Sequence, residues 1–438
     1  MKANLGLIFF PAFDWMISPT HPERQERLLY TRDQLQEEGI FDLKQIREYR
    51  PRLAEISDLQ RVHIGIPAIA KLITSAHLVS AGGCLTAADA VMLSEVKRAF
   101  ALVRPPGHHA MRVVHGIRGF CVINIEAIMV SYLRQKYGVK KIAVVDTDVH
   151  HGDGSQDIFY HDPDTLYLSF HQDGRTLYPG SGFTDEAGSP AALGANINLP
   201  LLPGTGDEGV HRLFDGIIKP ILDDFEPEVI INSAGQDNHF SDPLASMAVT
   251  AQGYARLAEK LRADIAVLEG GYSVEAALPY VNTGIILAMA GLDYSRVVEP
   301  EKSILPPQDP RCGARVEELI RDVGELWRNR MDLRREALAK CGEKWSRRKN
   351  IYYDEEGISE QQLETVHYCQ SCSGYLTIKT EADNTRFGSQ SAFIAIIGPG
   401  SCPACRRKAF DEALAEKKIR SWNYTLVQDT ATGIIESI

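Results

Sequence analysis

The residues best suited to chemistry fall in one short stretch, residues 144–154. Residues 142–145 are apolar in a row, which predicts the end of a buried strand, and Asp146, Asp148 and His150 follow at alternate positions. Side chains two apart in a strand share a face, so these three start out pointing the same way. Carboxylate oxygens and imidazole nitrogens are ligands of divalent ions such as zinc. The alternative is a polar loop that closes a strand, but burying so many ionisable groups without a metal or partners is costly.

Polar side chains also follow other apolar runs. His108 and His109 come after one such run and a rigid Pro-Pro-Gly turn, Asp237 follows a second run, and Tyr272 follows a third. Taken alone, a histidine is most often a core or surface residue, and Asp237 has the setting of an ordinary turn residue. In a parallel sheet, however, ligands bind outside the carboxyl ends of the strands. We therefore expect one crevice to collect all of these groups.

The chemistry of a metal site follows from this set. A catalytic zinc ion usually has three protein ligands and one open position for water. Asp148 and His150 supply two ligands from one strand end, and Asp237 is the candidate for the third, because it lies just past a Ser-Ala-Gly turn where the backbone can approach closely.

The other polar groups are suited to proton transfer. His108 and His109 supply two imidazoles, and Asp146 and Asp153 are placed to orient them and tune their basicity. Tyr272 lies in a glycine-rich loop, from which its hydroxyl can donate to a carbonyl oxygen that becomes an oxyanion. With a metal-activated water, these groups predict metal-assisted hydrolysis of an amide.

The elements that must position these groups alternate between apolar strands and amphipathic helices. This pattern predicts an α/β fold with a mostly parallel multi-stranded sheet that has helices on both faces. The expected strands lie at residues 1–11, 99–103, 141–146, 165–170, 195–199, 228–233 and 265–269. The expected helices lie at residues 22–34, 61–80, 87–100, 207–223 and 251–261, with a further helix that ends near residue 135.

Composition excludes several classes of protein. The chain has 438 residues, with 47 basic and 58 acidic side chains and a net charge of -11, which argues against a nucleic-acid or anionic-membrane binder. Residues 1–11 are expected to form a strand, and neither a signal peptide nor a membrane span. The eight cysteines do not form the pattern of a disulfide scaffold, so we expect a reducing compartment and a cytoplasmic protein.

The motifs together resemble the zinc-dependent histone deacetylase family, whose superfamily also contains acetylpolyamine amidohydrolases and arginases. The similarity covers about residues 1–295, and we expect a catalytic domain at residues 1–298. The motifs that carry the resemblance are His21-Pro-Glu-Arg24, Arg104-Pro-Pro-Gly-His-His109, Gly119-Phe-Cys121, Asp146-x-Asp-x-His-His-Gly-Asp153, Ser169-Phe-His-Gln-Asp173, Asp237 with Asp242-Pro243, and Glu269-Gly-Gly-Tyr272.

The resemblance implies a role for each group. The implied catalytic zinc ligands are Asp148, His150 and Asp237. The implied proton-transfer and carbonyl-binding groups are His109 with Asp153 as general base and acid, His108 with Asp146 as electrostatic partner, and Tyr272 as the residue that polarises the carbonyl.

The resemblance also implies a substrate passage and sites for potassium or sodium. The walls of the passage would be Gly119, Phe120 and Tyr178, and Arg27 aligns with an arginine that the family places by an internal channel. The implied monovalent-cation sites are one near Asp146, Asp148, His150, Ser169 and Phe170, and a second near Phe159, Asp162 and Thr165.

Several alternatives stay open. Arginase-like chemistry needs two manganese ions and more ligands, whereas the histidine pair and Tyr272 fit one zinc ion better. Leu244 resembles the apolar residue of protein lysine deacetylases, where polyamine deacetylases tend to have an acidic residue, so acyl-lysine in protein is favoured over an acylated small amine. The rim aspartate with which relatives hold the substrate backbone has no clear counterpart, and Asp58 matches it poorly by position. A binding module that recognises acylated ligands without turnover is the last alternative.

A linker and a long charged helix are expected at residues 299–350. The linker is residues 306–310, and the helix is residues 316–349. One apolar stripe on this helix should pack on the body or on a second copy of the chain, as in a homo-oligomer. The stripe consists of Leu319, Ile320, Val323, Leu326 and Trp327.

Residues 351–438 are expected to resemble a zinc ribbon. Two Cys-x-x-Cys pairs flank β segments at residues 375–380 and 392–397, and a structural zinc ion would stabilise a module too small for its own core. A redox dithiol or a disulfide pair is the alternative, with His367 as a possible substitute ligand. The expected zinc ligands are Cys369, Cys372, Cys402 and Cys405, and the cysteines expected to be buried or incidental are Cys84, Cys121, Cys312 and Cys341.

Overall fold

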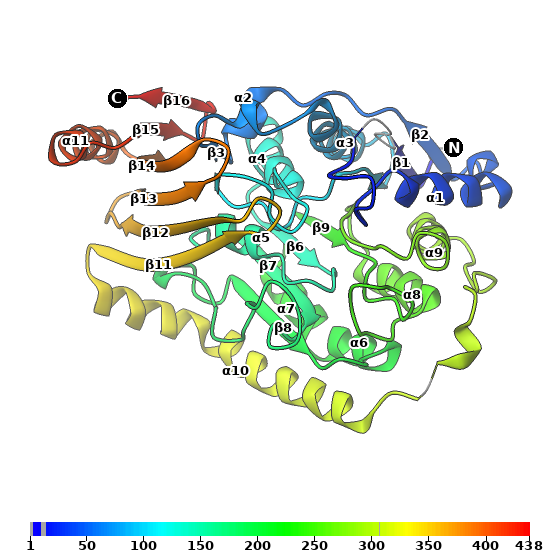
Figure 1. Cartoon of the computed structure of the whole chain (residues 1–438). Coiled ribbons are helices and arrows are strands. Elements are labelled where there is room, and N and C mark those ends of the chain that lie inside the picture. The colour runs from blue at the N-terminus through cyan, green and yellow to red at the C-terminus, as the bar shows by residue number, and fades with distance from the viewer. Residues whose placement is uncertain (1–2, 10–14, 306) are drawn as a thin grey trace.

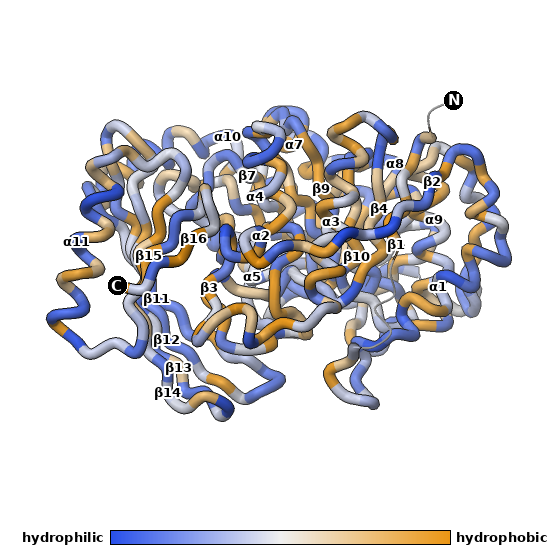
Figure 2. Tube along the Cα trace, turned by 90° about the horizontal axis from the view of Figure 1, so that it is seen from above, coloured by the Kyte–Doolittle hydropathy of each residue, from blue (hydrophilic) through white to orange (hydrophobic). Residues whose placement is uncertain are grey.

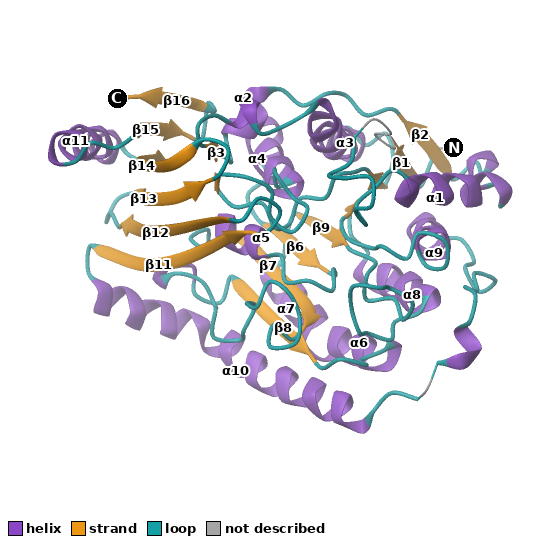
Figure 3. Cartoon of the chain, in the orientation of Figure 1, coloured by secondary structure: helices purple, strands orange, loops and turns teal. Residues whose placement is uncertain are grey.

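A parallel sheet of eight strands forms the centre of the protein (Figures 1 and 3). The computed structural model describes residues 3–9, 15–305 and 307–438. The strand order is β2-β1-β4-β10-β9-β6-β7-β8, and every neighbouring pair is parallel. The strands are β1 Leu5–Phe9, β2 Ile46–Tyr49, β4 Arg98–Leu102, β6 Ile142–Asp146, β7 Thr165–Gln172, β8 Asn196–Leu201, β9 Val229–Ala234 and β10 Ile265–Leu268. The predicted α/β fold class is confirmed.

Helices cover both faces of this sheet because the strands are apolar on both sides. Alternate residues of β4 illustrate this, since Phe100 and Leu102 join one hydrophobic core and Ala99 and Ala101 join the other. Figure 2 shows hydrophobic residues concentrated around the central strands. The helices on the first face are α1 Glu26–Glu37, α6 Asp207–Leu213, α7 Lys219–Phe225, α8 Ala251–Leu261 and α9 Leu278–Ala290, with a π-helix, Phe214–Ile218, between α6 and α7. Those on the second face are α2 Ile56–Gln60, α3 Ser75–Met92, α4 Ile125–Tyr137 and α5 Asp153–Phe159.

The predicted helices at residues 61–80 and 87–100 are wrong in their boundaries. One helix, α3, begins at Ser75 and ends at Met92, and residues 61–74 instead contain the short strand β3, Ile64–Gly65, and a 3-10 turn, Ile69–Lys71. Pro67 interrupts helical hydrogen bonding there. Thr74 caps the new helix, since its backbone N–H donates to His77 Nδ1 at 3.1 Å. β3 pairs in parallel with β5, Val113–Val114, in a separate two-stranded sheet.

The long helix α10, Pro310–Cys341, differs from its prediction at both ends. Asp309 caps its start by accepting from Arg311 N at 2.8 Å, so Pro310 lies in the first turn and not in a linker; Pro306 lies outside the described residues. Residues 344–349, predicted as helix, lie in a strand. Gly342, at φ +65°, ends the helix. The predicted stripe packs on the protein's own body, where Leu319, Val323 and Trp327 join the core of the first face.

A second sheet, of six strands, follows α10 and lies beside the body (Figure 1). Its strands are β11 Lys344–Tyr353, β12 Ile358–His367, β13 Tyr375–Asn384, β14 Gly388–Ile397, β15 Tyr424–Asp429 and β16 Ile434–Ser437, in that order. Helix α11, Pro403–Ile419, connects β14 to β15, which are parallel, and the other neighbouring strands are antiparallel.

This C-terminal sheet is larger than the predicted ribbon and has a core of its own. Phe393 and Ala395 pack against Ala409 and Ala413 of α11, so a metal ion is not its only source of stability. The opposite face packs on the body, where Ile378, Ile394 and Ile396 share a hydrophobic cluster with residues of β3 and β5.

We expect Ile394→Ala to destabilise the protein, because Ile394 is fully buried between the C-terminal sheet and the body. The expected loss is about 2–5 kcal/mol in the free energy of unfolding. The matched control is Ile419→Ala, since Ile419 is 76% exposed, and its expected effect is within about 0.5 kcal/mol. Urea denaturation of both variants measures the difference, and equal effects would contradict the burial of Ile394.

Candidate active site

Two aspartates and one histidine meet at the carboxyl ends of β6 and β9. His150 Nδ1 lies 3.2 Å from Asp148 Oδ1 and 3.1 Å from Asp237 Oδ2, and the three ligand atoms all lie within 4.8 Å of one another. Asp148 and Asp237 are fully buried. The structure therefore brings together the three residues predicted to hold the catalytic metal.

The backbone around this cluster leaves no room for additional side chains. A Cβ atom on Gly235 would lie 2.0 Å from Asp148 Oδ2, and one on Gly270 would lie 2.2 Å from Asp237 Oδ2. The Gly270 N–H donates to Asp148 Oδ2 at 2.7 Å, and the Val149 N–H donates to Asp237 Oδ1 at 2.9 Å. These contacts fix the carboxylates toward a common point, as a small cation requires.

The electrostatics of the cluster also favour a cation. Burial and the neighbouring Asp148 raise the pKa of Asp237. Burial disfavours the charged form of His150, but its hydrogen bonds to Asp148 and Asp237 raise its pKa to about 10. Two buried carboxylates this close repel each other unless positive charge lies between them. A donor set of two carboxylates and one imidazole fits a divalent metal ion.

Two carboxylate-backed histidines flank the cluster. His108 Nδ1 lies 3.2 Å from Asp146 Oδ2, and His109 Nδ1 lies 2.8 Å from Asp153 Oδ1. Each pairing occupies the Nδ1 atom and leaves Nε2 for other partners; His108 Nε2 lies 3.8 Å from Asp148 Oδ1. The structure therefore pairs each of the two histidines with an aspartate, and the proton-transfer roles of these four residues stay predictions.

The two histidines have different protonation behaviour. Burial and the neighbouring His108 lower the pKa of His109 to about 3, so its ring is neutral at neutral pH. Burial opposes the charged form of His108, but Asp148 and Asp146 raise its pKa to about 10. Neighbouring titratable groups with divergent pKa values are typical of acid–base sites.

Tyr272 lies in the loop after β10, near enough to the cluster for the charges of Asp237 and Asp148 to act on its hydroxyl. The Tyr272 N–H donates to Asp242 Oδ2 at 2.7 Å, and its ring lies 5.4 Å from that of Phe120. Burial raises the pKa of Tyr272 well above its ordinary value, so the hydroxyl keeps its proton and can donate it in a hydrogen bond. Leu244 lies on the same side, since its N–H donates to Asp242 Oδ1 at 3.0 Å.

Arg27 lies beneath the Tyr272 loop. Its Nε donates to Gly271 O at 2.7 Å, its guanidinium also binds Glu269 O, and it pairs with Glu23 at 3.0 Å. The side chain is fully buried. These contacts give Arg27 a supporting position, and the substrate or channel role that the resemblance implies stays a prediction.

Two of the three predicted wall residues contact His109, and the third, Phe120, packs against His21. The Tyr178 ring is 5.1 Å from the His109 ring, and the Phe120 ring is 4.3 Å from that of His21. Gly119 has φ +49°, and a Cβ atom there would lie 2.4 Å from His109 Cδ2. Glycine at this position therefore lets the wall approach the histidine closely.

Three supporting residues were missed by the sequence analysis. Arg118 Nε donates to Asp153 Oδ2 at 3.0 Å, and Tyr167 OH donates to Asp146 Oδ2 at 2.8 Å. The Glu269 carboxylate accepts from His108 N at 2.9 Å. Glu269 belongs to the Glu269-Gly-Gly-Tyr272 motif, which could have indicated a role for it. Nothing near Arg118 or Tyr167 in the sequence indicates a contact with a residue more than 20 positions away.

The residues implied for monovalent cations lie in two places. Asp146 pairs in register with Ser169 across β6 and β7, next to Phe170. At the second place, Asp162 Oδ2 accepts from Thr165 Oγ1 at 2.8 Å and Phe159 O accepts from Asp162 N at 2.9 Å. The Arg134 guanidinium also binds Asp162 and Thr165 there. Both cation sites stay predictions.

Four cysteines form a second metal-type cluster in the C-terminal sheet. Cys369 and Cys372 lie in the loop between β12 and β13, and Cys402 and Cys405 lie at the start of α11. All four sulfur atoms lie within 4.8 Å of one another, and each cysteine is free. Hydrogen bonds from Ser371 lower the pKa of Cys369 to about 6, which favours the thiolate that metals bind.

His367 does not share this cluster. Its Nε2 lies 3.1 Å from Thr377 Oγ1, and its ring stacks on Tyr375 at 4.1 Å. The four cysteine sulfur atoms alone match the number of donors that a structural zinc site uses.

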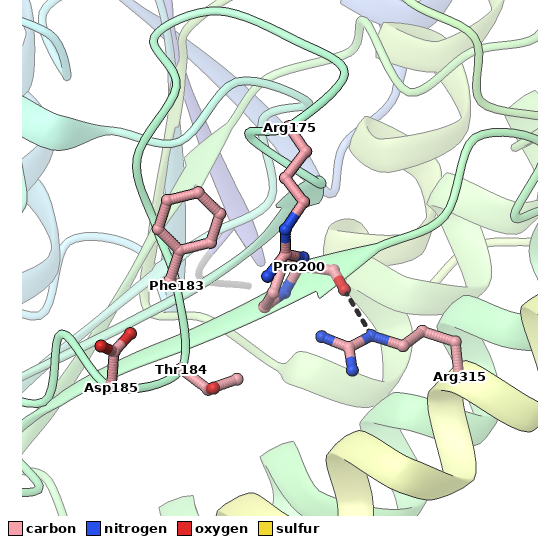
Figure 4. Close-up of a pocket in the computed structure, with 6 residues that line it drawn as sticks. All are labelled: Arg175, Phe183, Thr184, Asp185, Pro200 and Arg315. Carbon is pink, nitrogen blue, oxygen red and sulfur yellow. Dashed lines mark hydrogen bonds between the residues drawn. The ribbon is translucent and has the colours of Figure 1, made fainter.

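A surface pocket of about 380 Å³ lies elsewhere, between β8 and α10 (Figure 4). None of its lining residues belongs to either cluster, and Arg315 there donates to Pro200 O at 3.3 Å. The lining residues are Arg175, Phe183, Thr184, Asp185, Pro200 and Arg315.

A buried cluster of two carboxylates and an imidazole beside carboxylate-backed histidines, at the edge of a parallel sheet, is typical of metal-dependent hydrolases. The histone deacetylase domain matches residues 66–287. The chain belongs to the histone deacetylase family and is a deacetylase of that family.

Known proteins resemble this chain over different lengths. A probable deacetylase of Archaeoglobus fulgidus is 47% identical over 311 residues, which cover 65% of this chain and 85% of that protein. The chloroplastic histone deacetylase 10 of Oryza sativa subsp. japonica is 40% identical over 213 residues, and there the match spans about half of each chain, 45% of this one and 47% of that one. The crystal structure of the HDA15 HD domain matches with a TM-score of 0.65 and 28% identity, over 77% of this chain and 99% of that chain.

None of the helices in the described part of the chain is long and apolar enough to cross a membrane.

We expect about two metal ions per chain, one in each cluster. Asp237→Ala should lose one ion, because two ligands do not hold it, and Cys372→Ser should lose the other. Cys341→Ser is the matched control, because Cys341 lies outside the cluster, and it should keep both. Elemental analysis of the purified variants measures this. Loss of both ions from either single variant would contradict two separate sites.

Proposed function

We propose that this protein is a zinc-dependent hydrolase that removes the acyl group from N-acetyl-lysine, or from a longer acyl-lysine, in proteins. The observation that supports this most is the convergence of Asp148, His150 and Asp237 beside His109 and Tyr272. Each of these groups has a role in amide hydrolysis, and no simpler packing argument explains five buried polar groups at one point.

The chain's own residues would divide the work. The two aspartates and His150 would hold a zinc ion, which would supply Lewis acidity toward the acyl carbonyl and toward water. His109, held by Asp153 and neutral, accepts the proton of the attacking water at Nε2 and returns it to the leaving amine. The Tyr272 hydroxyl donates a hydrogen bond to the carbonyl oxygen as negative charge develops there.

The surroundings of the site favour an alkyl chain beside the carbonyl. Phe120 and Tyr178 offer aromatic faces, and half-buried Leu244 offers an apolar one. An apolar Leu244 gives a second substrate cation no partner, which favours acyl-lysine over an acetylpolyamine. Asp58 is buried and pairs with Arg61 at 2.6 Å, so it is engaged away from any substrate backbone.

The proposal also covers the metals, the location and the partners of the protein. Zinc is the proposed metal of both clusters, potassium or sodium the proposed monovalent ion, and a cytoplasmic location the proposed setting, since free thiolates suit a reducing compartment. The apolar stripe of α10 packs on the body. A homo-oligomer formed through α10 would therefore lack this apolar contact surface. Nucleic acid stays an unexpected partner because of the net charge of -11.

We expect Tyr272→Phe to lower kcat by about 10²–10³-fold, because it removes the hydroxyl that stabilises the oxyanion. Metal content and melting temperature should stay close to those of the wild type. Tyr30→Phe is the control, since Tyr30 is 40% exposed on α1. Steady-state hydrolysis of an acetyl-lysine peptide measures kcat. A Tyr272→Phe enzyme with wild-type turnover would refute the assigned role, and substrate binding without turnover in the wild type would favour the non-catalytic alternative.

A panel of substrates tests the proposed preference for acyl-lysine over acetylated diamines. We expect the wild type to prefer acetyl-lysine and longer acyl-lysine peptides over N-acetylated diamines in kcat/KM. Leu244→Glu should shift the ratio about tenfold toward the diamines, because a carboxylate there would pair with their free ammonium group. The panel is measured on wild type and variant side by side. A wild type that prefers diamines would favour the small-molecule alternative.

A further inference from the structure

The turn between β11 and β12 reaches the predicted walls of the substrate passage. Asp354 Oδ1 accepts hydrogen bonds from Gly119 N at 3.0 Å and from Tyr178 OH at 3.1 Å. Both donors are wall residues, and they come from separate segments of the chain. One carboxylate oxygen from the C-terminal sheet therefore joins two walls of the catalytic pocket.

The next two residues of the turn bind the same region. Glu355 Oε1 lies 3.2 Å from His21 Nε2, and His21 packs against the wall residue Phe120. Glu356 Oε2 accepts from Ile117 N at 2.6 Å. The approach is close, since a Cβ atom on Gly116 would lie 1.9 Å from Glu356 Oε2.

The end of β11 also contacts the support of His109. The Arg118 guanidinium donates to the carbonyl of Tyr352, and its Nε donates to Asp153 Oδ2 at 3.0 Å. Asp153 in turn holds His109 at 2.8 Å. A continuous line of contacts therefore runs from the backbone of β11 to the histidine proposed as general base.

The hairpin is fixed in this position by buried contacts on the body. Tyr353 is 1% exposed, and its hydroxyl donates to Val113 O at 3.0 Å. Ile351 and Ile358 pack with Met111, which follows the catalytic histidine pair in sequence. The turn is thus anchored by both of its strands.

Charged contacts reinforce this docking a few residues away. Arg347 lies 3.1 Å from Asp157 of α5, and Lys349 pairs with the same carboxylate. Arg347 also binds Glu364, which is fully buried. Removing either partner of such a buried pair is costly, so these pairs help to hold the C-terminal sheet on the body.

We propose that residues 354–356 form part of the wall of the substrate passage, and that Asp354 is a positioning residue that holds Gly119 and Tyr178 beside the acyl chain. This inference rests on the proposed hydrolase function. It makes the C-terminal sheet a part of the active site. A carboxylate acceptor suits the task, because hydrogen bonds to a charged group are stronger than neutral ones.

The test compares Asp354→Ala with Asp354→Asn in the full-length, metal-loaded protein. The alanine variant loses the acceptor, and kcat/KM should fall about tenfold. The asparagine variant keeps a side-chain oxygen that accepts both bonds, so it should recover most of the loss. Asp383→Ala is the matched control, because Asp383 lies in β13 of the same sheet and its Oδ1 accepts from Ser389 at 2.7 Å.

Tyr178→Phe adds a test that needs no change in the turn. It removes one hydroxyl and should lower kcat/KM several-fold; in the double variant with Asp354→Ala the two losses should not add, because they break the same hydrogen bond. If Asp354→Ala folds poorly by its melting temperature, the single variant Tyr178→Phe decides the matter, and an unchanged kcat/KM in it would overturn the proposal. Additive losses would overturn the proposal.

Binding of a zinc-chelating alkyl hydroxamate, measured by calorimetry, separates this inference from the proposed function. A wild type that binds the hydroxamate but hydrolyses no acyl amide would refute the function, while weaker binding by Asp354→Ala with recovery in Asp354→Asn would still support the wall. Wild-type or higher affinity and turnover in Asp354→Ala, or equal losses in the alanine and asparagine variants, would overturn the wall proposal.

Discussion

The burial of two carboxylates and an imidazole at the edge of one sheet is the constraint on which the rest of the structure depends. Like charges in a dry interior are tolerated only when opposite charge and hydrogen-bond donors surround them. The glycines at 235 and 270 admit the backbone that supplies part of this compensation. Parallel topology supplies the rest, because it delivers β6, β9 and β10 side by side with their carboxyl ends together.

Other buried carboxylates of the catalytic domain are also paired with positive charges. Asp153 is balanced by Arg118, and burial alone would raise the pKa of Asp153, but Arg118 and His109 lower it. On the other side, Glu23 is fully buried between Arg27 and Arg104, and although burial opposes its ionisation, the two guanidinium groups lower its pKa. The site is therefore held by pairs of opposite charge and not by hydrophobic packing alone.

The sequence predicts those features that local pattern controls. Apolar runs of β spacing followed by Asp148 or Asp237 indicated both the sheet and the residues that meet at its edge. The prediction of a helix at residues 61–80 is wrong. Pro67 and the N-cap residue Thr74 decide where the helix begins, and the apolar periodicity of the segment does not show this. The contact of Arg118 with Asp153, and those of the turn at residues 354–356 with Gly119 and Tyr178, join positions that are far apart in sequence. No local sequence pattern predicts such contacts.

Residues 352–356 lie late in the chain, which matters for the order in which the contacts of the site form during synthesis. Translation delivers the metal ligands, the histidine pair and Tyr272 well before residues 352–356 leave the ribosome. A nascent chain that has already folded its eight-stranded sheet still lacks the contacts at Gly119, Tyr178 and Arg118. The contacts of residues 352–356 with Gly119, Tyr178 and Arg118 therefore form only after the segments that carry the metal ligands have been synthesised.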